Sequence, residues 1–133
     1  MIVVIDTNVW VSALRFGGAV AQQVDRVLAD EGIAIAMSPQ LVAELNRVLV
    51  DKFKLGAQQW LDVEAYLDVH TYSVVPSGDE PVLCRDPADN HVLHLCRATQ
   101  AGLLITGDTD LLVLDPFEVT RICRPASLPI YLP

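Results

Sequence analysis

The sequence lacks the features of membrane and secreted proteins. No apolar run reaches the roughly 18 residues that a membrane-spanning helix needs, although 52% of the 133 residues are hydrophobic. The first residues, Met-Ile-Val-Val-Ile-Asp, include no basic region and reach an acid almost at once, unlike a signal or transit peptide. We therefore expect a cytoplasmic protein that does not enter a membrane.

Cysteine is scarce and its spacing is uninformative. The three cysteines, Cys84, Cys96 and Cys123, show no CxxC spacing, which disfavours both a disulfide framework and a zinc site. His91 and His94 can share a helical face, but no cysteine or third histidine completes a zinc set. We expect the cysteines to be buried thiols.

Phosphate-binding loops and positive charge are also lacking. Neither GxGxxG nor GxxxxGK[ST] occurs, and nine Lys and Arg residues face 17 Asp and Glu residues, for a net charge of −8. A protein that binds nucleic acid through a broad electrostatic footprint is usually basic, so any such contacts must be local. Carboxylates gathered in one pocket lower the total and are neutralised when a divalent cation binds.

Length and hydropathy indicate the number of domains and the oligomeric state. We expect one domain, residues 1–133, whose core needs no disulfide or metal to fold. The mean hydropathy of +0.37 is high for a soluble monomer. Surplus apolar surface is expected to lie in a subunit interface, giving a homodimer or a higher homo-oligomer.

Short β-branched runs alternate with helical patterns along the chain. The runs are continuously apolar, as expected for strands buried on both faces of a parallel sheet. This order of elements predicts an α/β sandwich. The predicted strands are 2–5, 33–37 and 103–105, with 119–123 as a fourth candidate, and the predicted helices are 19–30, 40–52, 57–68 and 89–101.

Two acids come at the ends of predicted strands, where open α/β sheets place their ligand crevice. Asp6 follows the first strand directly, and Asn8 could orient it or bind water there. Asp108 follows a later strand after a glycine, and the Thr106 hydroxyl could orient an acid or a water. The alternative for Asp6 is that it caps the turn of helix that follows.

Three further acids belong to predicted helices. Glu44 lies at the edge of an apolar stripe, and its alternative role is a surface pair with Arg47. Asp86 before Pro87 fits an N-cap, which places Asp89 at the third helical position. We prefer Asp89 as a site residue because the N-cap occupies Asp86, but either could be the third acid.

The acids together predict more than they do singly. Capping does not explain why acids from two strands and two helices should converge on one crevice, where like charges raise one another's pKa. A hard cation such as Mg²⁺, which prefers oxygen ligands, relieves this repulsion. Asp110 could support the site or cap a short helix. Cations near these motifs could contact phosphate, with a solvated helix face as the alternative: Arg15, Arg47, Lys52, Lys54 and Arg85.

The same motifs resemble the PIN-domain family over nearly the whole chain. The resemblance is carried by Asp6-Thr7-Asn8 after a strand, by a helical Glu44 and by the tracts Cys84 to Asn90 and Thr106 to Leu111. The segment Pro125 to Pro129 is similar too. The sequence looks most like the VapC-like toxin components of bacterial and archaeal toxin–antitoxin pairs.

This resemblance implies a three-layer fold with a parallel sheet of about four or five strands between helices. It also implies a ribonuclease that uses Mg²⁺ or Mn²⁺ and an antitoxin partner that covers the crevice. The matching acids are Asp6, Glu44, Asp89 and Asp108, and the matching supporting positions are Asn8, Thr106 and Asp110. A divalent cation can lower the pKa of water and stabilise charge on phosphate oxygens, so no side chain needs to become a covalent nucleophile.

Two other functions compete with this reading. A degenerate PIN fold could bind RNA or protein without cutting, although all four acids are present. A phosphotransfer domain of the haloacid-dehalogenase or receiver type also has an acid at a strand end. The dehalogenase-type signature needs a second aspartate two residues after the first, where this chain has Asn8.

Overall fold

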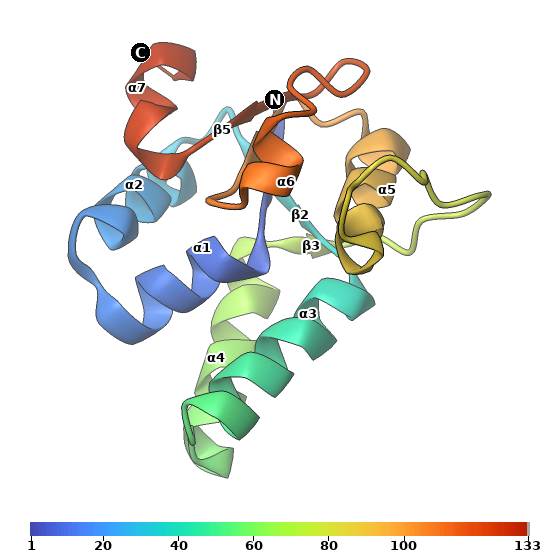
Figure 1. Cartoon of the computed structure of the whole chain (residues 1–133). Coiled ribbons are helices and arrows are strands. Elements are labelled where there is room, and N and C mark those ends of the chain that lie inside the picture. Colours follow the sequence, from blue (N-terminus) through green and yellow to red (C-terminus); the bar gives the residue numbers. More distant parts are fainter. Residues whose placement is uncertain (133) are drawn as a thin grey trace.

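The computed structural model describes residues 1–132 and shows five parallel strands in one sheet (Figure 1). Their order across the sheet is β3-β2-β1-β4-β5. Val4 in the central strand lies opposite Ala36 on one side and Leu104 on the other. The strands are β1 (Ile2–Ile5), β2 (Ala34–Met37), β3 (Tyr72–Ser73), β4 (Leu103–Ile105) and β5 (Arg121–Cys123).

Helices connect the strands, as parallel pairing requires. Figure 1 places α2 and α7 on one side of the sheet and α5 on the other, so the predicted three-layer α/β fold is confirmed. The α-helices are α1 (Thr7–Val11), α2 (Gly18–Ala29), α3 (Pro39–Asn46), α4 (Ala57–His70), α5 (Asn90–Thr99), α6 (Thr109–Leu112) and α7 (Leu128–Tyr131). Two π-helical segments, η1 (Ser12–Phe16) and η2 (Arg47–Lys52), extend α1 and α3, and 3₁₀ turns η3 (Pro87–Asp89) and η4 (Pro125–Ser127) precede α5 and α7.

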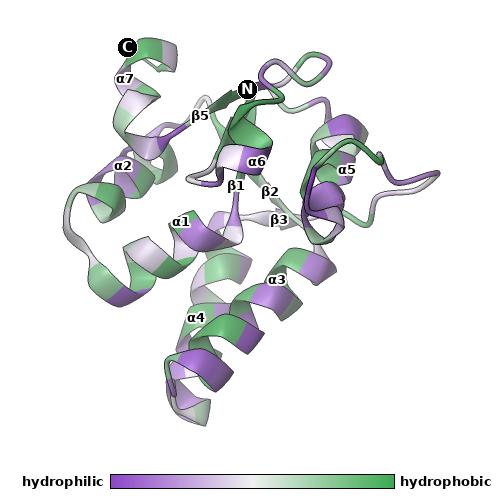
Figure 2. Cartoon of the chain, viewed as in Figure 1, coloured by the Kyte–Doolittle hydropathy of each residue, from purple (hydrophilic) through white to green (hydrophobic). Residues whose placement is uncertain are grey.

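The core lies between the sheet and the helices. The central strands β1 and β4 are almost wholly buried, as their continuously apolar sequences predict. Figure 2 shows that the helices carry both hydrophobic and hydrophilic residues, as expected for helices that cover a sheet. The three cysteines are buried and free, which confirms the prediction from their spacing: Cys84, Cys96 and Cys123.

Local sequence explains where α3 begins. The Ser38 hydroxyl accepts a hydrogen bond from the Leu41 amide at 3.1 Å, and Pro39 occupies the first helical position. The predicted helix 40–52 is therefore real, but its second half is π-helical rather than α-helical. The strand at Tyr72–Ser73 was not predicted, because its two residues are exposed at the sheet edge and give no apolar pattern.

No helix within residues 1–132 is long and apolar enough to cross a membrane. The strand ends that matter for function all point to one edge of the sheet, because every strand is parallel.

Candidate active site

Asp6 lies where β1 passes into α1, and its two carboxylate oxygens have separate partners. Oδ1 accepts a hydrogen bond from the Thr7 amide at 2.8 Å, so Asp6 is the N-cap of α1. Oδ2 accepts one from the Thr106 hydroxyl at 2.7 Å. The side chain is 4% exposed. The capping role and a place at the strand-end crevice therefore belong to the same residue.

The loop after β4 is tied to Asp6 through one hydroxyl group. Thr106 Oγ1 donates to Asp6 and accepts a hydrogen bond from the Asp108 amide at 3.0 Å. Asp108 in turn caps α6 by accepting a hydrogen bond from the Asp110 amide at 2.9 Å. Asp108, rather than Asp110 as the sequence suggested, is thus the cap of that short helix.

The two acids before α5, Asp86 and Asp89, have different roles. Asp86 is exposed, and its carboxylate accepts a hydrogen bond from the Ala88 amide at 3.0 Å, as its predicted N-cap role requires. Asp89 caps nothing. Burial raises the pKa of Asp89 to about 7, and the neighbouring carboxyl of Asp108 and the charge of Asp6 act in the same direction. Asp89 is therefore close enough to Asp108 and Asp6, the two acids that follow strands, for their charges to raise its pKa.

Glu44 approaches the site from α3 and is held by a histidine. His91 Nε2 donates to Glu44 Oε2 at 3.0 Å, and this hydrogen bond is the main reason why the pKa of Glu44 is lowered. Within residues 1–132 Glu44 forms no ion pair with Arg47, so the alternative surface pair is not formed. The residues around this pair line a hollow of about 320 Å³: Gln40, Ala43, Glu44, Arg47, Ala88 and His91.

The pKa of Asp6 responds to two of the other candidate acids. Burial raises the pKa of Asp6 above its usual value, and the charges of Glu44 and Asp108 add to this rise. The hydrogen bonds from Thr106 and Thr7 oppose it. A buried carboxylate with two donors and several acidic neighbours is an arrangement that a bound cation would stabilise.

The donor set fits a hard divalent cation by its chemistry. As they stand, no three His, Cys, Asp or Glu side chains within the described residues are grouped tightly enough to hold an ion by themselves. Mg²⁺ does not need such a cage, because it commonly keeps several waters and uses one or two carboxylates. Burial is the main reason why the pKa values of Asp6 and Asp89 are raised, and neither acid is in an ion pair within residues 1–132.

The supporting residues predicted from the sequence differ in their placement. Thr106 is fully buried and links two acids. Asn8 is exposed, and its side chain takes part in no hydrogen bond among residues 1–132. Asp110 forms an ion pair with Arg85, whose Nε lies 2.9 Å from Asp110 Oδ1. Arg85 therefore neutralises an acid at the rim of the site, which competes with its expected role as a phosphate contact.

Two residues of the site were missed by sequence reasoning. His91 was considered only as a zinc ligand, yet it is 5% exposed and pairs with an acid 47 positions away. Asn90 is buried, and its Oδ1 accepts hydrogen bonds from the Leu83 and Cys84 amides at 3.3 and 2.9 Å, which fixes the chain that leads into Asp86. The available signal was the polar pair Asn90-His91, which follows the acids at the start of α5. The local sequence does not reveal which residues this pair contacts.

Known proteins support the family suggested by these motifs. Among solved structures, VapBC2 from Rickettsia felis bound to a DNA fragment from their promoter contains a similar chain, with 16% identity and a TM-score of 0.67 over 93% of this chain and 98% of that chain. At 16% identity, this similarity shows that the two chains share a fold and nothing more. No curated protein matches the chain. The sequence matches the PIN domain family over residues 2–110, and the chain therefore belongs to the PIN-domain family.

Proposed function

We propose that this protein is a Mg²⁺- or Mn²⁺-dependent endoribonuclease that hydrolyses RNA phosphodiester bonds. PIN domains are generally nucleases, which supports a hydrolase acting on nucleic acid. The proposal is supported by Asp6 and Asp108, which follow the neighbouring parallel strands β1 and β4, and by Asp89, whose pKa is raised by burial, by Asp108 and by Asp6.

The proposed cation ligands are Asp6, Asp89 and Asp108, with Glu44 facing the same crevice. When bound, a divalent cation would supply charge neutralisation and Lewis-acid activation for attack on phosphorus. It would also oppose the effects of burial and of the Asp108 carboxyl, which raise the pKa of Asp89, and favour the ionised form of Asp89 near neutral pH.

The chain's own residues orient this site. Thr106 and the Thr7 amide fix both oxygens of Asp6, so its carboxylate enters the reaction already oriented. His91 holds Glu44 in the same way and favours its ionised form. Arg47 lines the hollow beside Glu44 and is the cation best placed to meet a phosphate of the substrate.

We further propose that the protein is the toxin of a toxin–antitoxin pair. A chain of the same fold is found in the VapBC2 structure, which gives the support for this step. A cognate antitoxin would block the acidic crevice most directly with a basic side chain, because carboxylates without a counter-charge attract a cation.

The decisive experiment compares wild-type protein with Asp6→Asn on a mixed set of structured and single-stranded RNAs. Each reaction is run with Mg²⁺, with Mn²⁺ and with chelator. We expect cleavage by the wild type that requires the cation and falls about 100-fold or more in Asp6→Asn. Asp25→Asn, which alters an exposed acid on α2, serves as the matched control and should keep full activity.

Equal cleavage by wild type and Asp6→Asn would indicate a contaminating ribonuclease or a different active site. Cation binding without any cleavage would instead favour the degenerate PIN fold that binds RNA or protein. Both results would overturn the proposed activity.

A further inference from the structure

The helix that follows Asp6 (α1 and η1) and the helix that carries Glu44 (α3 and η2) converge at their far ends. There Phe16 and Phe53 pack edge to face, with ring centroids 5.7 Å apart and planes at 86°. The Arg15 guanidinium lies 5.4 Å from the centroid of the Phe16 ring and 5.8 Å from that of Phe53, and the Lys52 ammonium lies 5.5 Å from the Phe53 ring. We call these four residues the aromatic–cation patch.

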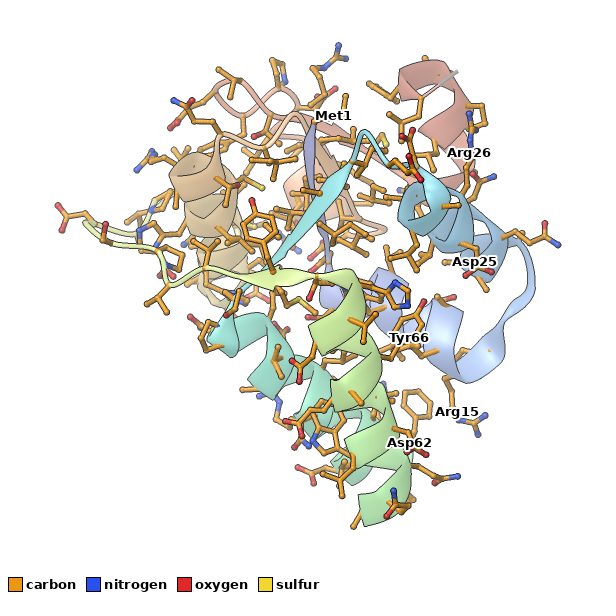
Figure 3. All side chains as sticks on the ribbon, turned by 180° about the vertical axis from the view of Figure 1, so that it is seen from behind. Met1, Arg15, Asp25, Arg26, Asp62 and Tyr66 are labelled. Atoms are coloured by element: carbon orange, nitrogen blue, oxygen red, sulfur yellow. The ribbon has the colours of Figure 1, made fainter. Side chains whose placement is uncertain are left out.

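The patch is open to solvent. Phe16 is 64% exposed, an unusual state for a large apolar ring in a chain with only eight aromatic residues among 133. Figure 3 shows Arg15 at the outer end of its helix, beside Asp62 of α4 in this view. Within residues 1–132 neither Arg15 nor Lys52 is in an ion pair with a carboxylate. Three other arginines of the chain are in such pairs: Arg85, Arg97 and Arg121.

The patch is also a cationic exception on an acidic protein. The segments 7–16 and 39–54 hold four of the nine Lys and Arg residues but only two acids, Glu44 and Asp51. The whole chain carries a net charge of −8. These two segments therefore attract a polyanion more than the chain as a whole does, and Glu44 at the crevice is one of the two acids within them.

The geometry connects the patch to the crevice. The continuous helix formed by α1 and η1 begins directly after Asp6 and ends at Phe16, a length of about 15 Å or slightly less. At the duplex rise of about 3.4 Å per nucleotide this distance spans about four nucleotides, and fewer if the strand is extended. One strand could thus occupy both places.

We propose that the aromatic–cation patch binds single-stranded RNA, with a base stacked on Phe16 and phosphates beside Arg15 and Lys52. This inference rests on the proposed ribonuclease function and adds a substrate subsite a few nucleotides from the cut. Aromatic faces flanked by unpaired cations suit single strands, since every base offers a π-face and every linkage a negative charge. A purely apolar protein partner would leave both cations without a counter-charge.

The test measures binding and cleavage with the full chain. Cleavage is followed on a ten-nucleotide single strand and on a dinucleotide that contains only the scissile bond and its two nucleosides. Binding of the ten-nucleotide strand is followed by fluorescence anisotropy in the Asp6→Asn background. Phe16→Leu keeps an apolar side chain but removes the stacking face, Phe16→Trp restores a face, and Tyr72→Leu alters an exposed aromatic residue on the edge strand β3 as the matched control.

We expect Phe16→Leu to raise KM and Kd for the ten-nucleotide strand about 5- to 150-fold with kcat nearly unchanged. The dinucleotide should show no such effect, because it is too short to reach the patch from the scissile bond. Phe16→Trp should restore both constants, Tyr72→Leu should match wild type, and Arg15→Gln should weaken binding and reduce its salt dependence.

The inference is overturned if Phe16→Leu cleaves and binds the long strand like wild type, or if it loses both substrates equally. A change in oligomeric state of Phe16→Leu by sedimentation would assign the patch to contact with a second copy and also overturn it. If wild-type protein cleaves no RNA, the proposed function fails, and the binding measurement alone decides this inference.

Discussion

At the scale of single residues, the site is built on one buried hydroxyl group. Thr106 donates to Asp6 and accepts from the Asp108 amide, so it fixes acids that follow two neighbouring strands. The sequence predicted these two acids and Thr106, because residues directly after buried strands must lie at the same sheet edge. It could not predict the hydrogen bonds, which join positions 100 residues apart.

Replacing Thr106 by valine tests this arrangement. Thr106→Val keeps the side-chain volume but removes the donor, so Asp6 loses orientation and its pKa rises further. We expect kcat for RNA cleavage to fall about 10- to 100-fold and the free energy of unfolding to fall by about 1 kcal/mol. Thr99→Val removes a hydroxyl bonded to the Leu95 carbonyl on α5 and should leave kcat unchanged. Unchanged kcat in Thr106→Val would show that Asp6 needs no such support.

The raised pKa of Asp89 predicts how stability depends on pH. A carboxyl with a pKa of about 7 in the folded state and 3.8 as its ordinary value holds its proton more tightly when folded. Its stabilising effect is therefore complete below about pH 4 and is lost as the pH rises through about 7. In chelator, we expect the Tm of the wild type to fall between about pH 5 and pH 8, and Asp89→Asn to fall less.

Mg²⁺ supplies the complementary measurement. At about pH 8 the added cation should raise the wild-type Tm, because it binds the ionised carboxylates of the folded state only. At about pH 5 the rise should be smaller, since protons compete for the same oxygens. A Tm that is the same in chelator at both pH values in wild type and Asp89→Asn would contradict this picture of the site.

His91 provides a third test at this scale. His91→Leu removes the donor to Glu44, so the pKa of Glu44 should rise. We expect both Mn²⁺ affinity and kcat to fall about tenfold or more, with partial recovery in His91→Gln, which keeps an N–H donor. His94→Leu, which loses only a hydrogen bond to the Ser77 carbonyl, is the matched control. Equal Mn²⁺ affinity in all three variants would remove His91 from the support of the site.

At the scale of elements, the sequence predicted what local chemistry determines. The helical pattern over 40–52 correctly marked α3, and the apolar runs correctly marked β1 and β4. The two-residue strand β3 and the π-helical turn η2 were not predicted from the sequence. Tertiary contacts, rather than side-chain patterns, determine these two elements. The sequence also left open the choice between Asp86 and Asp89, because both acids fit the start of one helix.

The start of α5 is held by Asn90, and this gives a prediction about stability. Its Oδ1 accepts hydrogen bonds from two backbone amides of the preceding loop. Asn90→Ala leaves these donors unpaired, so we expect the free energy of unfolding in urea to fall by about 1–3 kcal/mol. Asn46→Ala, whose half-buried side chain makes no hydrogen bond among the described residues, should change it by no more than about 0.5 kcal/mol. A similar loss in both variants would refute the role of Asn90.

At the scale of the whole molecule, charge is separated along two helices. The acids gather at the strand ends, while α1–η1 and α3–η2 lead from them to the aromatic–cation patch. This separation explains how a chain with a net charge of −8 could still bind RNA locally. The homo-oligomer expected from its hydropathy stays a prediction, which sedimentation at several protein concentrations would test.

The central claim is that Asp6, Asp89 and Asp108, with Glu44 facing the same crevice, hold a divalent cation. Calorimetric titration of the folded protein with Mn²⁺ tests it most directly. We predict saturable binding with release of protons near neutral pH, weakened at least about tenfold in Asp6→Asn and in Asp108→Asn but unchanged in Asp25→Asn. Absence of binding by the wild type, or equal binding by all four proteins, would contradict the claim.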